Sequence, residues 1–91
     1  MTMRALFVGG GVDNSELDMD EGEAPVHYPP DSGGGQPRYR LHQLGMRADG
    51  SVAYAVYGAP GIADAEVRRV AYERKYARRF EATPREIESE G

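Results

Sequence analysis

Two short stretches near the start of the chain have the hydrophobic pattern of β-strands. Residues 4–8 form a largely apolar run that stops at the glycines of residues 9–11, which favours a buried strand followed by a turn. Residues 15–20 then alternate, with Leu17 and Met19 on one face and three acidic side chains on the other. We therefore expect a first antiparallel hairpin whose second strand is half exposed.

A second hairpin is indicated by the strand-like stretches 39–47 and 51–57, which flank an Ala-Asp-Gly sequence. A three-residue turn with Gly50 in the left-handed conformation would place Arg47 opposite Ser51. The pairs that follow along one face are Met46 with Val52, Leu44 with Tyr54 and His42 with Val56. A two-residue turn would instead pair Met46 with Ala53 and Leu44 with Ala55, which is a poorer apolar match. We prefer the first register.

Residues 21–37 contain four prolines and four glycines, so they predict a long flexible Pro/Gly loop rather than a regular element. We expect residues 31–36 to be mobile. The tract 25–30 has two interpretations. It is either a peptide ligand for an aromatic groove of a partner or, as we favour, an extended segment strapped across the sheet by Val26 and Tyr28.

A helix is predicted from Asp64, as N-cap, to Phe80 or Glu81. Its expected inward stripe is formed by Ala63, Val70 and Ala77, flanked by Val67 and Phe80. Arg69 is placed to pair with Glu66 and Glu73, three and four residues away. The sequence Thr83-Pro84-Arg85-Glu86 has the form of a capping box and predicts one further helical turn.

These elements predict an α+β fold: a small antiparallel sheet of two β-hairpins, about four strands, with one C-terminal α-helix packed on one face. The 91 residues allow one domain, which we place at residues 1–82 with the loop 21–37 inside it. Residues 83–91 are interpreted as a short acidic C-terminal tail or helical turn. The sheet face that a single helix leaves uncovered is an expected contact surface.

Composition adds constraints on partners and location. The chain has no cysteine, which excludes disulfides and thiolate metal sites and suits a cytoplasmic protein. A core this small has few supports apart from close packing or self-association. The net charge of −4 is unevenly spread: residues 1–37 carry −6, residues 38–79 carry +5 and the last twelve carry −3. Such segregation favours pairing with another copy or with a charged partner. No apolar run is long enough to cross a membrane.

The most distinctive candidate site lies on the outward side of the predicted helix. Arg68, Tyr72, Lys75 and Arg79 recur at spacings of four, three and four residues, which places them in one basic stripe with an aromatic ring among the cations. Such a stripe can contact the phosphates and bases of a nucleic acid, or an acidic partner. The alternative, which we favour, is that the stripe is the ordinary solvated face of the helix.

The other candidates for chemistry are weaker. The glycines 9–11 lack the Lys-Ser/Thr and the helix that a phosphate-binding loop needs. Asp13, Asp18 and Asp20 lack the spacing of a calcium loop, and we expect no metal. His42 has no serine or cysteine nucleophile suited to it, so we interpret it as a half-buried hairpin residue. We expect no catalytic residues and no cofactor.

The opening residues 3–10, MRALFVGG, resemble the start of many small phage and prophage proteins. The later plan of a Tyr-Arg strand, a turn, a Val/Tyr strand and a C-terminal helix is also similar. In that group the glycine pair is commonly followed by proline and then an Asp-Gly turn, whereas this chain has Gly11-Val12-Asp13-Asn14. The resemblance implies a phage accessory protein and carries over no site residues.

We therefore predict a non-enzymatic phage accessory protein of the host cytoplasm that binds itself, as a homo-oligomer such as a dimer, or binds a host protein. The alternative is a nucleic-acid-binding protein that uses the basic and aromatic face of the C-terminal helix.

Overall fold

The computed structural model describes residues 3–20, 24–28 and 38–87. In chain order the elements are β1 (Met3–Val8), the short 3-10 turn η1 (Gly10–Val12), β2 (Glu16–Met19), β3 (His27–Tyr28), β4 (Tyr39–Met46), β5 (Val52–Gly58), α1 (Asp64–Glu73), α2 (Tyr76–Arg79) and β6 (Thr83–Glu86). The α+β class is confirmed. The expected four strands and one helix are too few, because the described residues form six strands and two helices.

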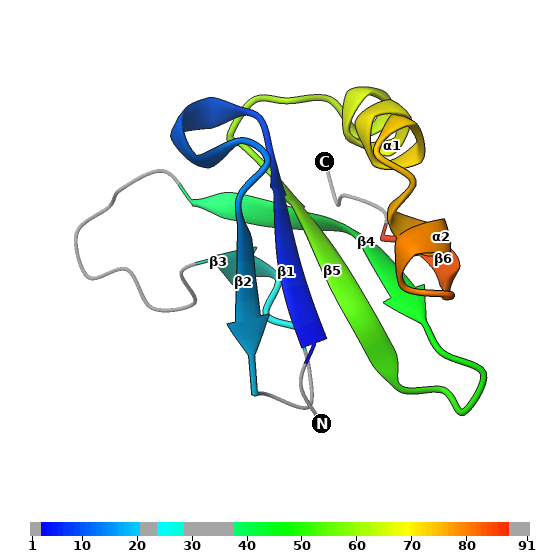
Figure 1. Cartoon of the computed structure of the whole chain (residues 1–91). Coiled ribbons are helices and arrows are strands. Elements are labelled where there is room, and N and C mark those ends of the chain that lie inside the picture. Colours follow the sequence, from blue (N-terminus) through cyan, green and yellow to red (C-terminus); the bar gives the residue numbers. More distant parts are fainter. Residues whose placement is uncertain (1–2, 21–23, 29–37, 88–91) are drawn as a thin grey trace.

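The strands form one mixed sheet in the order β2-β1-β5-β4-β3, with β6 also paired to β4 (Figure 1). Strand β5 is central: it pairs with β4 antiparallel and with β1 in parallel. The parallel pairing joins the two predicted hairpins, so the sheet is mixed and not purely antiparallel as expected. Residues 53–57 of β5 are almost completely buried, because both edges and both faces of this strand are covered.

Each face of the sheet carries its own core. On the helix side the buried residues are Leu6, Val8, Ala53, Tyr54, Val56, Val67, Ala71 and Tyr76. On the opposite side they are Met3, Ala5, Phe7, Met19, Leu41, Ala55 and Tyr57. The face opposite the helices is therefore largely buried, contrary to the expectation of an uncovered face, although Leu17 at its β2 end stays 40% exposed. Tyr28 lies 5.5 Å from the Phe7 ring, and the Tyr57 hydroxyl donates to the Pro25 carbonyl oxygen at 2.7 Å.

In the residues described, the expected strap is instead an edge strand, because His27 and Tyr28 pair with Arg40 and Tyr39 as β3, while residues 29 and 30 of the tract lie outside the described part. Tyr28 packs against the core, but Val26 is exposed and contributes little to it. The expected mobile stretch 31–36 and most of the Pro/Gly loop lie outside the described residues. None of the helices in the described part of the chain is long and apolar enough to span a membrane.

The turn between β4 and β5 has the predicted form. Gly50 has φ +89°, its N–H donates to the Arg47 carbonyl oxygen, and the Arg47 N–H donates to Ser51. The predicted pair Met46–Val52 is present. Beyond it, however, a bulge at Ala53 shifts the register, so that Leu44 pairs with Ala55 as in the alternative that we rejected.

A second bulge, at His42, cancels the first and restores the predicted register at Leu41–Tyr57. His42 therefore does not face Val56; it is 1% exposed, beneath the start of α1. Its Nδ1 atom lies against the carboxylate of Asp64. The N-cap is Ala63, not Asp64, which is the first residue of the helix. Asp64 thus faces a buried imidazole instead of capping the helix.

The first hairpin is confirmed, with β2 antiparallel to β1 and Ala5 paired with Leu17. Gly9 has φ +80°, which glycine adopts without strain and which allows the chain to turn immediately after β1. On the helix side, Arg4 donates to Glu16 and Asp18 at 2.9 and 2.5 Å, so this acidic face is partly neutralised. Within the described residues, no group of three or more potential ligands could hold a metal ion.

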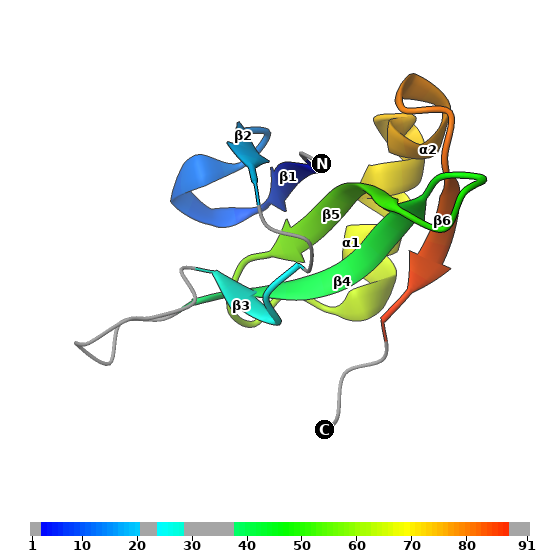
Figure 2. The same cartoon turned by 90° about the horizontal axis from the view of Figure 1, so that it is seen from below.

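The predicted capping box at residues 83–86 is wrong, because these residues form strand β6. Figure 2 shows β3 and β6 along the same edge of β4, at opposite ends. The Ile87 N–H donates to the His42 carbonyl oxygen, and β4 pairs Leu44 with Arg85 and Gly45 with Pro84. In an antiparallel ladder every second residue directs its N–H and C=O groups to the neighbouring strand. The backbone groups of Pro84 point away from β4, so the N–H that proline lacks costs no hydrogen bond of the ladder. Residues 83–86 thus belong to the sheet and are neither a tail nor a helical turn.

A test of the packing on the helix side is available at Gly45, which lies under the Tyr54 ring. A methyl group at this position would overlap the ring atoms. We expect Gly45→Ala to lower the free energy of unfolding by about 1–3 kcal/mol, the usual cost of overpacking a core. Urea denaturation measures the change. Gly11→Ala is the control, because nothing lies within 4 Å of its added methyl group; an equal loss there would contradict the explanation.

The buried histidine predicts a pH dependence of stability. Burial lowers the pKa of His42, Asp64 opposes this shift, and the charges of Arg40 and Arg68 add to it. The unfolded chain therefore binds a proton more readily than the folded protein. Stability should be complete above about pH 6.5 and fall as pH decreases, by at most about 1.4 kcal/mol per pH unit.

Urea denaturation between pH 7.5 and 5.5 tests this pH dependence. His42→Gln should remove the slope, whereas the control His27→Gln should keep it. An unchanged slope in the His42→Gln variant would show that other groups cause the effect.

Candidate functional site

The predicted single helix is interrupted after Glu73. The Lys75 N–H donates to the Tyr72 carbonyl oxygen, and Lys75 has the left-handed φ of +58°, so the chain turns before α2 begins at Tyr76. A non-glycine residue in this conformation costs about 1–2 kcal/mol. The side chains that follow the break explain why the chain accepts this cost.

At 100° per residue, a straight helix would place Tyr76 about 180° from Val67, facing water. The break instead turns Tyr76 inward, where it is 1% exposed and 6.1 Å from the Tyr54 ring. Phe80 follows it and packs 5.3 Å from Tyr54. Burying one large side chain stabilises a protein by about 1.5–3 kcal/mol, so these two residues outweigh the strain at Lys75.

The inward face of α1 is correspondingly different from the prediction. Val67 and Ala71 are its buried residues, whereas Val70 is only partly buried and Ala63 is exposed. Ala77, beyond the break, is also partly buried. The predicted ion pairs are confirmed: Arg69 contacts Glu66 at 2.6 Å and Glu73 at 2.7 Å.

The break also divides the predicted basic stripe. Arg68 and Tyr72 lie on α1, Lys75 lies at the break, and Arg79 lies on α2. Arg68 is half-buried and pairs with Glu86 at 3.1 Å. The other end of the stripe turns toward β2, where Arg79 pairs with Glu16 at 3.0 Å and its guanidinium lies over two aromatic rings. The four residues therefore do not form one continuous cationic surface.

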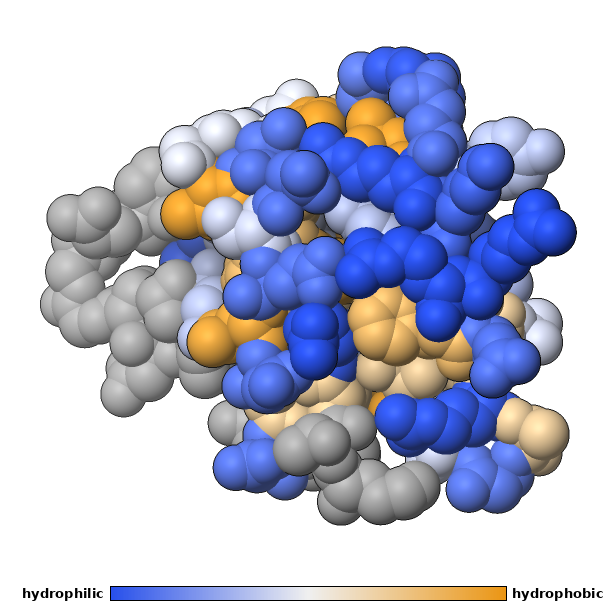
Figure 3. Space-filling view, in the orientation of Figure 1, coloured by the Kyte–Doolittle hydropathy of each residue, from blue (hydrophilic) through white to orange (hydrophobic). Residues whose placement is uncertain are grey.

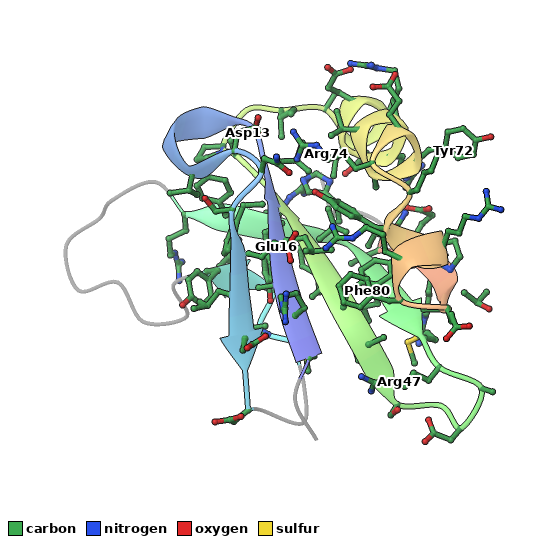
Figure 4. All side chains as sticks on the ribbon, in the orientation of Figure 1. Asp13, Glu16, Arg47, Tyr72, Arg74 and Phe80 are labelled. Atoms are coloured by element: carbon green, nitrogen blue, oxygen red, sulfur yellow. The ribbon has the colours of Figure 1, made fainter. Side chains whose placement is uncertain are left out.

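What remains is a smaller site around Tyr72, which we call the Tyr72 surface and define by Tyr72, Lys75 and Arg78. Tyr72 is 85% exposed and points away from the body of the protein (Figure 4). A hollow of about 240 Å³ is lined by these three residues and Ala77. Within the described residues, Lys75 and Arg78 make no ion pair, in contrast to Arg68 and Arg79.

A second hollow, of about 190 Å³, is also lined by Tyr72 and reaches Gln43 of the sheet. Gln43 and Glu86, which line this hollow, belong to a chain of polar groups that continues into the core. The Tyr54 hydroxyl donates to the Gln43 Oε1 atom at 3.0 Å, and the Gln43 Nε2 atom donates to Glu86 at 2.9 Å. Glu86 in turn contacts Arg68 at the rim. The bulge at Ala53 contributes to this arrangement, because it sets Gln43 opposite Val56 and Gly45 opposite Tyr54.

The chemistry of these polar groups is suited to binding and poorly suited to proton transfer. Burial, together with the nearby Glu86 charge, raises the pKa of Tyr54 to about 12, so its hydroxyl stays protonated at neutral pH. Gln43 does not titrate, and Glu86 accepts two hydrogen bonds from its amide. Tyr72 offers an aromatic face, and the two unpaired cations offer charge to an acidic group.

Sequence reasoning found Arg68, Tyr72 and Lys75 but missed Arg78, Gln43 and Glu86. The signal for Arg78 was its place beside Arg79 in the same basic run, but a continuous helix would have directed it elsewhere. Gln43 and Glu86 meet through a strand pairing 43 residues apart in sequence, for which the local pattern contains no signal.

A search of protein-family models, of curated proteins and of solved structures finds no match to this chain.

The buried polar chain predicts a difference between two tyrosines. Tyr54→Phe removes the hydroxyl that donates to Gln43 and should lower the free energy of unfolding by about 1–2 kcal/mol, because the buried amide oxygen loses this donor. Tyr72→Phe changes an exposed hydroxyl and should stay within about 0.5 kcal/mol of the wild type. Urea denaturation of both variants measures this. Equal effects would mean that the Gln43 contact contributes nothing.

Proposed function

We propose that this chain is a non-enzymatic binding protein that recognises an acidic segment of a partner protein through the Tyr72 surface. The observation that carries the proposal is the position of Tyr72: a ring that is 85% exposed, beside two cations without an ion pair among the described residues. An exposed aromatic ring beside unpaired charge is typical of residues that dominate protein interfaces.

The number of available cations favours a protein partner over a nucleic acid. Of the cations in residues 64–79, Arg68, Arg69, Arg74 and Arg79 have carboxylate partners among the described residues, which leaves Lys75 and Arg78. Two phosphate contacts would weaken binding only about tenfold between 50 and 200 mM salt, whereas DNA-binding proteins with 6–10 contacts lose about 10³–10⁵. A single-stranded nucleic acid stacked on Tyr72 is the second candidate, supported by the exposed ring.

In a phage accessory protein, as the resemblance of residues 3–10 implies, the partner would be a host protein or a second copy of the chain. Either would supply carboxylates to Lys75 and Arg78 and an apolar or aromatic side chain to pack on Tyr72. The two hollows beside the ring give such side chains a place to lie.

Binding to defined probes tests the proposal. The probes are a capped nine-residue peptide alternating glutamate with phenylalanine, and a nine-nucleotide oligothymidylate. We expect the peptide to bind, with Tyr72→Ala and Arg78→Gln each weakening it five- to tenfold. Arg69→Gln is the matched control: it removes the same charge from an arginine already held by Glu66 and Glu73, and it should change affinity less than twofold.

Two results would contradict the acidic-protein proposal. One is peptide binding that Arg69→Gln weakens as much as Arg78→Gln, which would show only general charge attraction. The other is binding of the oligonucleotide alone with a steep salt dependence, which would favour the nucleic-acid function. Sedimentation of the free protein identifies self-association, which should be lost in Tyr72→Ala if the partner is a second copy.

A further inference from the structure

The outer edge of β2 forms a second surface, separate from the Tyr72 surface, and three features of it point to one kind of occupant. We propose that an extended, basic segment of a partner protein adds to this edge as a further strand, with apolar side chains in the cavity beside Leu17. β2 is the terminal strand of the sheet order, so one of its edges has no strand of the described residues beside it (Figure 2).

The first feature is the direction of the backbone groups in β2. The Phe7 N–H donates to the Ser15 carbonyl oxygen, and Ala5 pairs with Leu17 two residues further along. In an antiparallel ladder the inward-bonding residues alternate, so the N–H and C=O groups of Glu16 and Asp18 point away from β1. No described residue bonds these groups. They form a short template for strand addition.

The second feature is an apolar cavity of about 330 Å³ on the sheet face opposite the helices. Its walls include Phe7, Leu17, Tyr28 and Tyr39, with Val12 at one end. The Phe7 and Tyr39 rings meet edge to face at 5.3 Å, and the Tyr39 hydroxyl donates to the Gly9 carbonyl oxygen at 2.7 Å. Two of the rings that line the cavity are therefore held in place by each other and by the Gly9 backbone.

Hydrophobic side chains reach the surface at this place. Val12 is 44% exposed and Leu17 is 40% exposed, and Figure 3 shows hydrophobic atoms among the hydrophilic ones over β2 and the turn before it. Because side chains of a strand alternate between faces, a strand added to β2 would direct every second side chain toward this cavity. The cavity is close to the lower limit of roughly 300 Å³ for small-ligand pockets, so it suits one large apolar side chain.

The third feature is the charge of the other face of β2. Asp18 keeps 66% of its side chain exposed although Arg4 contacts it, and Asp20 follows in the same alternation. Burial raises the pKa of Glu16, but hydrogen bonds from Arg4 and Arg79 hold it below its ordinary value, so the carboxylate stays charged. An added strand with basic side chains on this face would meet carboxylates directly across the ladder.

The same charges argue against a second copy as the occupant. Two β2 strands related by a twofold axis would place Glu16 and Asp18 of one chain opposite the same carboxylates of the other, and like charges directly opposite destabilise a strand pair. A segment that alternates basic and apolar residues avoids this repulsion and also fills the cavity.

A peptide probe tests the proposal. The probe is a capped seven-residue peptide in which lysine alternates with valine and a central phenylalanine. We expect its binding to protect the amides of Glu16 and Asp18 from hydrogen exchange, because these amides would enter the new ladder. A peptide with glutamate for lysine, and one with serine for the apolar residues, should each bind at least tenfold more weakly.

Two variants at one position separate the backbone contribution from the charge. Asp18→Pro removes an N–H that faces away from β1 and should weaken peptide binding tenfold or more. Asp18→Asn keeps the N–H and should weaken it two- to threefold. Exchange of the Ala5 amide, on the neighbouring strand, reports whether Asp18→Pro keeps the β1–β2 ladder.

Equal binding by the two folded variants would overturn the proposal, as would peptide binding that leaves the Glu16 and Asp18 amides unprotected in the wild type. Protection of these amides in the protein alone, accompanied by dimer formation, would assign the edge to a second copy and also overturn it. A failure of the acidic peptide to bind the Tyr72 surface would not affect the test of the β2 edge, because the two surfaces share no residue.

Discussion

The enclosure of β5 is the constraint on which the rest of the structure depends. A chain of 91 residues can bury only a small core, and without cysteine it has no disulfide to support that core. This chain concentrates its apolar residues on a strand that contributes to both cores. Tyr54 anchors the core under the helices and Tyr57 anchors the core on the opposite face. β1 and β4 cover the two edges of β5. The helices α1 and α2 cover one face, and residues of the 24–28 segment pack on the other.

The features that the sequence predicts are those set by neighbours in the chain. The turn at Gly50, the alternation of β2, the start of the helix within one residue and the Arg69 ion pairs are all local, and all are confirmed. The errors arise where distant contacts compete with a local preference. Thr83 and Glu86 have the pattern of a helix start, but the free edge of β4 offers them a complete ladder. The helix breaks at Lys75 because Tyr54 offers Tyr76 a buried position.

The same distinction explains the candidate site. The helical spacing of basic and aromatic residues predicted one stripe of four side chains. Two of them, Tyr72 and Lys75, belong to the Tyr72 surface. Arg79 is paired with a carboxylate 63 residues away, and the break at Lys75 directs it toward β2. The available charge of a basic helix therefore depends on which acids the rest of the fold brings beside it, and composition alone overestimates it.

Pro84 gives the two ends of the sheet different properties. The outer side of β6 has no donor at this position, and β3, at the other end of the same edge, is only two residues long. A further strand at this far edge would therefore lack one hydrogen bond at Pro84, whereas the proposed addition at β2 would meet the N–H groups of both Glu16 and Asp18. If a partner strand adds at β2, the weaker edge at the far side would favour an assembly that ends after this single step.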